Sequence, residues 1–512
     1  MSTAIDATGS SATPPSGDRG FFGHPRGLST LFFTEMWERF SYYGMRAILT
    51  LYMTKTLAEG GLGFDEKYAS LIYATCVSSV WYLPLIGGWL ADKIFGARRA
   101  VLIGGIVIAC GHYSMAINTQ PNFYAGLILI ACGTGLLKPN ISAMVGQLYQ
   151  QGDERRDAGF SIFYMGINLG AFLSPIVVGF LAQAQWFRHF ITSLGFNPNS
   201  TWHWGFGAAG VGMTLGLLQY VIGRDRLRAV GTKPQRQQRN TERAVNFDFV
   251  TLGLAVFGGV TGAALGFYFG EARFVSALFP CVVGFFTGHL IGTTRLLTGD
   301  ELKRVLVIFI LFVFSILFWM TYEQAGSSLT LFADRLTRTT VFGWQYPSSW
   351  FQSVPAVFVI ILAPVFAALW QRLGVRQPSS PGKFTYGLIF AGLAFVLVTF
   401  ASMLTGGGRV SVWWLIGVYF LQTLGELCLS PVGLSTVTKL SPGRMVGLMM
   451  GVWFLSISIG SYIAGLTTRL FAGNAQGVLT RAFGMFAVIT LIAALVLALL
   501  TPLIKKLTPR SA

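Results

Sequence analysis

The stretch FTYGLIFAGLAFVLVTFASM, residues 384–403, contains 20 residues and no charged side chain. A helix of about 20 apolar residues crosses the roughly 30 Å hydrocarbon core of a lipid bilayer. Similar runs recur along the chain, whose 512 residues are 53% hydrophobic and only 11% charged. Soluble proteins carry about a quarter charged residues, so the composition excludes an ordinary soluble enzyme. It indicates a protein that crosses the membrane many times.

Boundaries drawn at charged residues and Pro/Gly breaks predict fourteen spans. All are expected to be helices, because the chain lacks the alternating ten-residue segments of outer-membrane barrels. The first six are 28–53, 68–90, 100–117, 123–148, 159–182 and 204–222. Two further spans, 249–269 and 274–297, carry few polar side chains and are expected at the periphery. The last six are 302–331, 350–373, 384–403, 413–440, 445–471 and 478–504.

The positive charges predict the orientation. With a cytoplasmic N-terminus, 25 of the 37 Lys and Arg residues fall in inside segments, 9 in outside segments and 3 within spans. This asymmetry favours cytoplasmic termini by the positive-inside rule. Seven of the inside charges lie in one connection, 224–243. We interpret it as a solvated linker near anionic lipid headgroups rather than as a nucleic-acid site.

Six spans, a basic linker and six more spans indicate two bundles around a site near the midplane. After the second span, GGWLADKIFGARR resembles the loop signature of the major facilitator superfamily, with Asp92, Lys93, Arg98 and Arg99 as its charged residues. The predicted fold is therefore an all-α membrane protein of that superfamily with 14 transmembrane helices. The predicted division is a disordered cytoplasmic N-terminus at 1–27, an N-terminal bundle at 28–223, a linker at 224–246, two additional helices at 247–298, a C-terminal bundle at 299–506 and a cytoplasmic tail at 507–512.

Ionisable side chains inside membrane spans are costly and are functional candidates by default. The segment TEMWERFSYYGMR, at 34–46, puts several of them on one face of the first helix. Others lie in later spans, flanked by apolar residues for at least two turns on one side. The seven charges inside spans are Glu35, Glu38, Arg39, Arg46, Lys138, Glu323 and Glu426.

These seven charges comprise three cations and four carboxylates, so one negative charge is unmatched when all are ionised. An unmatched buried carboxylate takes up a proton, and the inventory therefore favours protonation inside the protein. The alternative is that the ion pairs merely fasten the two bundles. That alternative is weaker, because hydrophobic replacements usually serve stability equally well.

Other polar and aromatic residues in the spans are less specific. Tyr73, Trp319 and Trp453 could line a pocket, although spacing alone favours packing roles. Asn168 lies in a span without other strong polar groups and needs a hydrogen-bond partner. The sequence shows no nucleophile beside a base and no metal-ligand spacing, so we predict no enzyme activity, no metal and no cofactor.

Six segments together resemble the proton-dependent oligopeptide transporter family, bacterial members most closely, over residues 28–504. They are ExxERFxYYG at 35–44, GGWLADKIFGARRAV at 87–101, KPNIS at 138–142, FSIFYMGINLGAF at 160–172, FWMTYEQAGSS at 318–328 and GELCLSPVGLS at 425–435. The two additional spans are similar to those of bacterial members. Members often carry Asn-Pro in the eighth span of the bundles, where this chain has Pro355 and Ala356, so an asparagine contact there is not expected.

The resemblance implies a symporter of the bacterial inner membrane that couples proton entry to uptake of di- and tripeptides by alternating access. Arg39 and Lys138 would meet the α-carboxylate of the peptide, and Glu426 its α-ammonium group. Lys138 and Glu426 are expected to pair across the cavity when it is empty. The full set of implied peptide ligands is Arg39, Tyr42, Tyr73, Lys138, Asn168, Trp319, Glu426, Ser430 and Trp453.

The family positions tied to proton coupling are Glu35, Glu38 and Glu323, and Arg46 is expected to pair with Glu323 across the bundles. A same-fold porter of another solute such as nitrate stays open, although the presence of both Glu35 and Glu38 argues against it. A non-transporting peptide receptor or a channel also stays open. The expected partners are peptide, protons and membrane lipid, without nucleic acid, and the chain is expected to function as a monomer.

Overall fold

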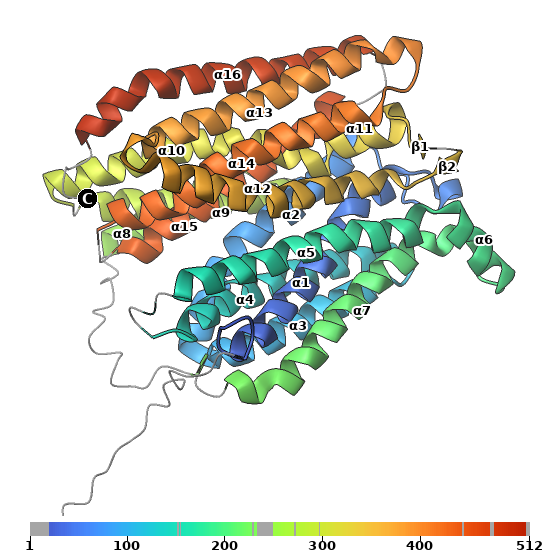
Figure 1. Ribbon diagram of the computed structural model, residues 1–512, viewed down its shortest axis with the longest axis horizontal. Coiled ribbons are helices and arrows are strands. Elements are labelled where there is room, and N and C mark those ends of the chain that lie inside the picture. Colours follow the sequence, from blue (N-terminus) through green and yellow to red (C-terminus); the bar gives the residue numbers. More distant parts are fainter. Residues whose placement is uncertain are drawn as a thin grey trace, which may run out of the picture.

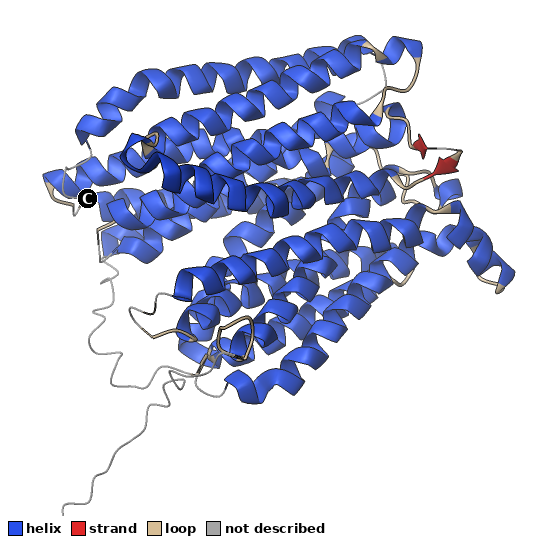
Figure 2. Cartoon of the chain, in the orientation of Figure 1, coloured by secondary structure: helices blue, strands red, loops and turns tan. Residues whose placement is uncertain are grey.

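The computed structural model describes residues 20–150, 153, 155–227, 230–232, 249–270, 273–295, 297–341, 343–442, 445–471 and 476–507. Within these residues the chain is almost entirely helical, as Figure 2 shows. One short antiparallel hairpin joins β1 (Thr340–Val341) to β2 (Trp344–Gln345), with Thr340 opposite Gln345. Most of the predicted N-terminal segment and linker fall outside the described residues, so the predicted division into domains stays a prediction.

The first half of the chain forms a bundle of six long helices. They are α1 (Gly27–Thr54), α2 (Glu66–Leu90), α3 (Ala97–Met115), α4 (Gln120–Gln147), α5 (Arg155–Gln183) and α7 (Thr201–Ile222). Shorter elements join them: η1 (Leu57–Glu59), the π-turn η2 (Ala91–Phe95), α6 (Gln185–Ser193), η3 (Pro198–Ser200) and η4 (Gly223–Leu227). Side-chain caps define some of the helix starts; Asp65, for example, accepts a hydrogen bond from the backbone N–H of Lys67.

The second half repeats this architecture after a helical hairpin of α8 (Phe249–Phe269) and α9 (Arg273–Thr294). Its helices are α10 (Gly299–Tyr322), α11 (Ser328–Leu336), α12 (Val354–Leu373), α13 (Ser380–Met403), α14 (Val412–Leu440), α15 (Val446–Thr467) and α16 (Gln476–Leu507). The connecting turns are η6 (Glu323–Gly326), η7 (Ser348–Ser353), η8 (Gly374–Arg376), η9 (Thr405–Gly407) and η11 (Thr468–Phe471).

The fourteen predicted spans are all present as helices, which confirms the predicted fold class. In the described part of the chain, twelve helical segments are long and apolar enough by composition to cross a membrane. The other two predicted spans are α1 and α3. The first of these carries four charged residues near its middle, Glu35, Glu38, Arg39 and Arg46, and those charges are the candidates for function.

The two bundles appear as an upper and a lower group of helices in Figure 1. They meet along two seams, where α2 packs against α15 and α5 packs against α12 and η7. At Gly465 of α15, a Cβ atom would lie 2.5 Å from the Cα of Ala74 in α2, so glycine permits this close approach. We call the end at which α1 begins and α16 ends the linker end. The opposite end, which carries α6 and the β-hairpin, is the far end.

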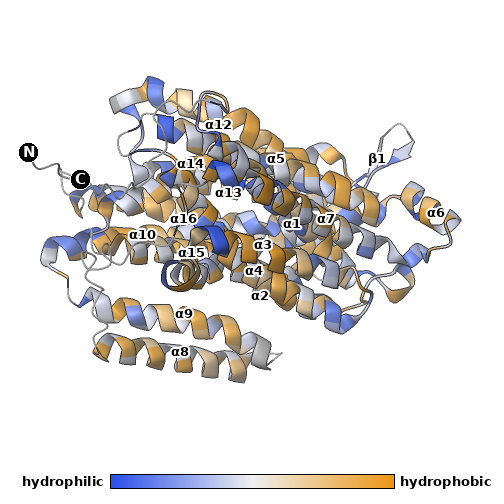
Figure 3. Cartoon of the chain, turned by 90° about the horizontal axis from the view of Figure 1, so that it is seen from below, coloured by the Kyte–Doolittle hydropathy of each residue, from blue (hydrophilic) through white to orange (hydrophobic). Residues whose placement is uncertain are grey.

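The α8–α9 hairpin lies at the edge of the molecule (Figure 3). The two helices pack closely on each other, because a Cβ at Gly258 would lie only 2.2 Å from the carbonyl oxygen of Gly284. The hairpin touches the bundles near the α2–α15 seam, where the ring of Phe279 stacks on Tyr462 with centroids 4.1 Å apart.

Two local features of the backbone were not predicted from the sequence. The span expected at 302–331 is interrupted at Glu323–Gly326, where the chain forms a 3₁₀ turn and Ser327 takes φ −127° and ψ −95° before α11 begins. The amphipathic helix α6 also lies between two predicted spans. The apolar pattern runs through the interruption of the helix, which is why hydropathy alone did not reveal it.

Candidate functional site

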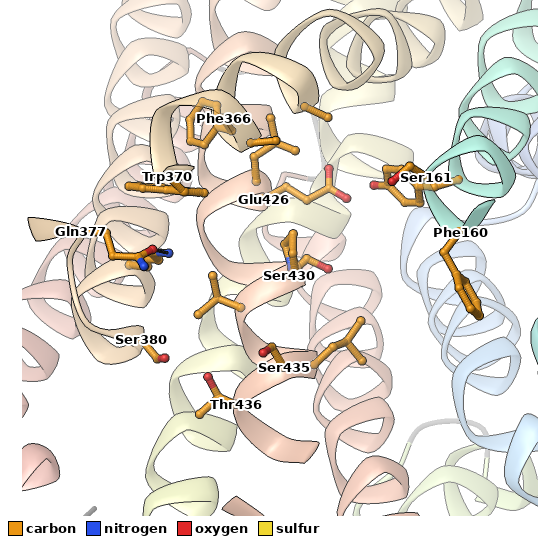
Figure 4. Close-up of a pocket in the computed structure, with 18 of the residues that line it drawn as sticks. Phe160, Ser161, Phe366, Trp370, Gln377, Ser380, Glu426, Ser430, Ser435 and Thr436 are labelled. Atoms are coloured by element: carbon orange, nitrogen blue, oxygen red, sulfur yellow. Dashed lines mark hydrogen bonds between the residues drawn. The ribbon is translucent and has the colours of Figure 1, made fainter. Parts of the chain in front are cut away.

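A cavity of about 1500 Å³ lies between the two bundles and reaches the linker end. Its walls come chiefly from α5, α12 and α14, and Figure 4 shows Glu426 of α14 facing the region of Ser161 on α5 across the opening. The cavity lining extends from Asn168 and Glu426, near the middle of their helices, to Lys439 and Lys505 in the last turns of α14 and α16.

Three of the predicted peptide ligands lie in this wall: Asn168, Glu426 and Ser430. The side-chain amide of Asn168 donates to the backbone oxygen of Tyr164, one turn earlier in α5, at 3.0 Å. The Glu426 carboxylate accepts a hydrogen bond from the Tyr322 hydroxyl at 2.5 Å. Both bundles therefore present polar groups to the same space.

Arg46 pairs with Glu323 across the two bundles, as predicted. Nη2 of Arg46 lies 2.5 Å from Oε2 of Glu323, and both side chains are buried. The Nε–H of Arg46 also donates to the Tyr73 hydroxyl at 3.0 Å. The 3₁₀ turn after α10 brings Glu323 to Arg46. The carbonyl oxygen of Gly326, in the same turn, accepts a hydrogen bond from the Thr50 hydroxyl of α1 at 3.0 Å.

A second cluster of buried charges forms within α1. Arg39 contacts the carboxylates of Glu35, at 3.2 Å, and of Glu38. The hydroxyl of Thr134 in α4 donates to Glu38 at 3.4 Å. The guanidinium of Arg39 also lies 5.5 Å from the ring centroid of Tyr42. The predicted common face of α1 is therefore real. Within this cluster a single guanidinium faces two carboxylates of its own helix, so one negative charge is not matched there.

The predicted pair between Lys138 and Glu426 is not formed in this structure, and the expectation is wrong for this conformation. The Lys138 ammonium instead lies 3.4 Å from the ring centroid of Trp81 in α2. Glu426 is held by Tyr322. The two charges therefore have separate neutral partners, a cation–π contact and a hydroxyl.

Two predicted aromatic ligands occupy packed positions. Trp453 is only 1% exposed, packs against Phe384 in the core of the second bundle and lies outside the cavity lining, so its predicted place in a pocket wall is not observed. The indole ring of Trp319 contacts Tyr322, with centroids 5.3 Å apart, and faces Trp81 at 6.4 Å. Its buried Nε1 has no hydrogen-bond partner among the residues that the structure describes.

The loop signature lies at the linker end of α2 and α3. Asp92 and Lys93 are in the exposed π-turn, and Arg99 is exposed at the start of α3. Arg98 connects this loop to the chain after α7: its backbone N–H donates to Gly231 and its guanidinium to the carbonyl of Arg224, at 3.1 and 3.4 Å.

Contacts between the bundles close the far end. The α5–η7 seam contains hydrogen bonds from Trp350 to the carbonyl of Ile176 and from Ser353 to the carbonyl of Phe172, at 3.1 and 2.7 Å. Toward the linker end, the same helix α5 lines the cavity with Phe160 and Ser161. The two bundles are therefore in contact along α5 at the far end, and the cavity lies between them toward the linker end.

Two ion pairs at the far end also join the bundles. Lys55 lies 3.0 Å from Asp334, and Arg335 lies 2.6 Å from Glu66. Partial burial pushes the pKa of Lys55 down, but the carboxylates of Asp334 and Glu59 more than offset this, so its pKa lies above the ordinary value. Lys55 therefore stays charged at neutral pH.

Sequence reasoning missed Trp81 and Tyr322, the partners of the two central charges. A signal for each was present. Trp81 follows Tyr73 by eight residues, which places both on one face of α2, and Tyr322 precedes Glu323 directly. In a chain with 14% aromatic residues this spacing was too common to distinguish them from packing residues.

Two helical bundles with buried charges at their interface, and a cavity between them that reaches the linker end, define a secondary transporter of the major facilitator type. Residues 98–480 match the sequence profile of the POT family, and the chain belongs to that family.

Relatives of similar length support this assignment. The chain is 41% identical to the uncharacterized transporter YclF of Bacillus subtilis, with 95% of this chain and 96% of the relative covered. It is 38% identical to the peptide transporter YePEPT of Yersinia enterocolitica, with 97% and 98% covered. It is 35% identical to a di-/tripeptide transporter of Lactococcus lactis, with 96% and 98% covered.

Solved structures of the family have the same architecture. A crystal structure of a peptide transporter in complex with alafosfalin matches with a TM-score of 0.83 and 41% identity, covering 99% of this chain and 100% of that one. A POT family transporter in complex with a thioalcohol-conjugated peptide matches with a TM-score of 0.79 and 33% identity, covering 95% and 98%.

Proposed function

We propose that this protein is a proton-coupled symporter that imports di- and tripeptides across the bacterial inner membrane by alternating access. The observation that carries the proposal is the asymmetry of the inter-bundle interface. Arg46 and Glu323 close it on the far side of the midplane, whereas the cavity with Asn168 and Glu426 opens toward the linker end. If the linker is cytoplasmic, this is the conformation from which a transported peptide leaves.

The charges around the cavity suit a zwitterion. Glu426 in the second bundle would bind the α-ammonium group of a peptide, and Arg39 and Lys138 in the first bundle its α-carboxylate. Lys138 is held by an aromatic ring and Glu426 by a hydroxyl. Both contacts are weaker than an ion pair, so either side chain can exchange its neutral partner for a charged end of the substrate.

Proton coupling would run through Glu35, Glu38 and Glu323. Protonation of Glu323 would remove its charge from the pair with Arg46 and so weaken the closure of the far end. Protonation of Glu35 or Glu38 would remove one of the negative charges that now face the Arg39 guanidinium. Arg39 would then be more available to bind the carboxylate of a peptide. The two clusters are on the same helix, α1, which offers a direct mechanical connection between them.

The test is uptake of labelled dialanine into proteoliposomes, with and without an imposed pH gradient. We expect uphill accumulation when the outside is acidic, and loss of that accumulation when a protonophore collapses the gradient. Protein-free liposomes provide the background. Equilibration without accumulation would contradict symport and favour a channel, and binding without uptake would favour a receptor.

The same assay distinguishes a porter of another solute. Excess unlabelled dipeptide should compete with labelled dialanine, whereas nitrate at the same concentration should not. Nitrate transport without peptide competition would contradict the proposal. We further propose that the monomer is sufficient, which reconstitution at less than one protein per vesicle can test.

A further inference from the structure

Three lysines line the linker end of the cavity. They are Lys383 in the first turn of α13, Lys439 in the last turn of α14 and Lys505 in the last turn of α16. None of the three has a carboxylate partner within the described part of the chain. Among the residues that the structure describes, Glu426 is the only acidic one in the lining. It precedes Lys439 by 13 residues in the same helix, or about 20 Å at 1.5 Å per residue.

Lys383 is the most unusual of the three because its side chain is buried, with 9% exposed. Its ammonium donates to the side-chain oxygen of Gln377 at 2.8 Å and lies 4.2 Å from the ring centroid of Trp370. Both partners are neutral. A buried cation normally has a charged partner, because neutral contacts compensate only part of the hydration that it loses.

Helix stability does not explain this cation. The N-terminus of a helix carries a partial positive charge, so a lysine in the first turn of α13 is unfavourable there. The helix start has no side-chain cap, and Ser379 and Ser380 beside it lie in the cavity wall. Lysine, serine hydroxyls and a helix N-terminus together form an environment suited to an oxyanion. Figure 4 shows Trp370, Gln377 and Ser380 grouped on one side of the cavity.

Farther from the lysines, the part of the cavity wall formed by α12 is apolar. α12 contributes Val359, Ile360 and Phe366 to the lining, and the opposite face of the same helix is exposed at Ile361 and Val365. Among the twelve candidate spans, α12 is the least covered by protein. An acyl chain that lies along the cavity-facing residues of α12 would make apolar contacts while its headgroup reached the lysines.

We propose that Lys383, Lys439 and Lys505 bind the phosphate of an anionic phospholipid at the linker end of the cavity. The chemistry recognised is a phosphate anion, which a lipid headgroup or inorganic phosphate in solution could supply. The apolar wall along α12 favours the lipid, because a free ion would make no use of it. Basic pockets between transmembrane helices are a known setting for acidic headgroups on the cytoplasmic side, which is where the charge asymmetry predicts this end.

The experiment is native mass spectrometry of the full-length protein in a non-ionic detergent, with phosphatidylglycerol or phosphatidylcholine of the same acyl chains at equal ratios. Wild-type protein should retain phosphatidylglycerol about tenfold better, the effect of one charge-assisted contact. Lys383→Gln should reduce retention to the phosphatidylcholine level, and Lys383→Arg should restore most of it. Lys506→Gln is the matched control, because Lys506 is the neighbour of Lys505 in α16 but lies outside the lining.

A second variant protects the test against a folding defect of Lys383→Gln. The double variant Lys439→Gln/Lys505→Gln removes two cations that are not buried and should also lose the preference. Equal retention of both lipids by the wild type, or an unchanged preference in both variants, would overturn the proposal. Displacement of phosphatidylglycerol by millimolar inorganic phosphate, together with Lys383-dependent thermal stabilisation by phosphate alone, would overturn the lipid assignment in favour of a soluble anion.

Discussion

The guanidinium of Arg46 in α1 lies 2.5 Å from the carboxylate of Glu323, which belongs to the other bundle and to the short 3₁₀ turn between α10 and α11. Both side chains are buried. Removing one partner of such a pair costs about 3–5 kcal/mol, because the remaining charge stays buried without compensation. The pair therefore joins the two halves of the protein, and each of the two charges depends on the other for its compensation.

Glu323→Gln should abolish gradient-driven accumulation while preserving exchange of peptide between the two sides, because exchange does not require the unloaded carrier to reorient. One pH unit supplies about 1.4 kcal/mol per proton and 100 mV about 2.3 kcal/mol, so a single coupled proton could sustain roughly 500-fold accumulation. The measurement is accumulation and counterflow in proteoliposomes. Asp300→Asn, which removes an exposed carboxylate paired with Lys303, is the control and should behave like the wild type.

The same prediction extends to Glu35 and Glu38. Each Gln variant should reduce accumulation, because each removes a carboxylate that contacts Arg39. Undiminished accumulation with unchanged pH dependence in all three Gln variants would show that proton coupling runs elsewhere.

Capped peptides test the orientation of the substrate. A dipeptide amidated at its C-terminus lacks the carboxylate for Lys138, so Lys138→Ala should weaken its binding less than that of the free dipeptide. For the free dipeptide the loss should be about 1.5–3 kcal/mol, roughly tenfold to a hundredfold in affinity. An N-acetylated dipeptide should show the matching pattern with Glu426→Gln. Inhibition constants in the dialanine assay provide the comparison, and equal losses for capped and free peptides would contradict the assigned direction.

Weakening the far-end ion pairs should shift the protein toward opening at that end. Each partly exposed pair contributes about 0.2–1 kcal/mol, so Lys55→Gln combined with Arg335→Gln should change the equilibrium several-fold. Spin labels at Leu57 and Trp344, both exposed at the far end, report the separation of the bundles. We expect a larger population of long distances.

Lys303→Gln is the control for this measurement, because Lys303 pairs with Asp300 on one helix at the linker end. A distance distribution that does not change in the double variant would mean that these pairs do not contribute to closure of the far end.

The segment before α1 should detach from the bundle as the pH falls. His24 is buried and its Nδ1 lies 3.0 Å from the Tyr149 hydroxyl. Burial, together with the nearby Arg155, lowers the pKa of His24 below its ordinary 6.5, while Asp153 opposes this. Because the docked state disfavours the protonated imidazole, docking is strongest above pH 6.5 and weakens below it. Hydrogen exchange of residues 20–26, corrected for intrinsic rates, should rise between pH 7.5 and 5.5, and the rise should disappear in His24→Asn.

A labelling experiment tests the predicted topology. A single cysteine at position 237, in the linker and outside the described residues, should resist an impermeant thiol reagent in intact cells. The background variant must lack the five native cysteines, two of which are exposed. Ser193→Cys at the end of α6, on the far end, should be labelled. Labelling of position 237 from outside would reverse the predicted orientation.

The sequence by itself determined the spans, because the length of an apolar run and the insolubility of a bare backbone in lipid are local properties. It also identified the charged face of α1, since residues three and four apart in a helix are neighbours. The pair of Arg46 with Glu323 was expected only through resemblance to a family, because no local pattern connects residues so distant along the chain.

Only the tertiary structure decided which partners the central charges have. Lys138 lies on Trp81 and Glu426 on Tyr322, although simple charge matching favoured a direct pair. Trp453 packs in the core, although its residue type was equally suited to a pocket wall. The physical reason is the same in each case. Opposite charges and aromatic rings can combine in many ways, and the choice among them depends on the relative position of two rigid bundles, which no local stretch of sequence encodes.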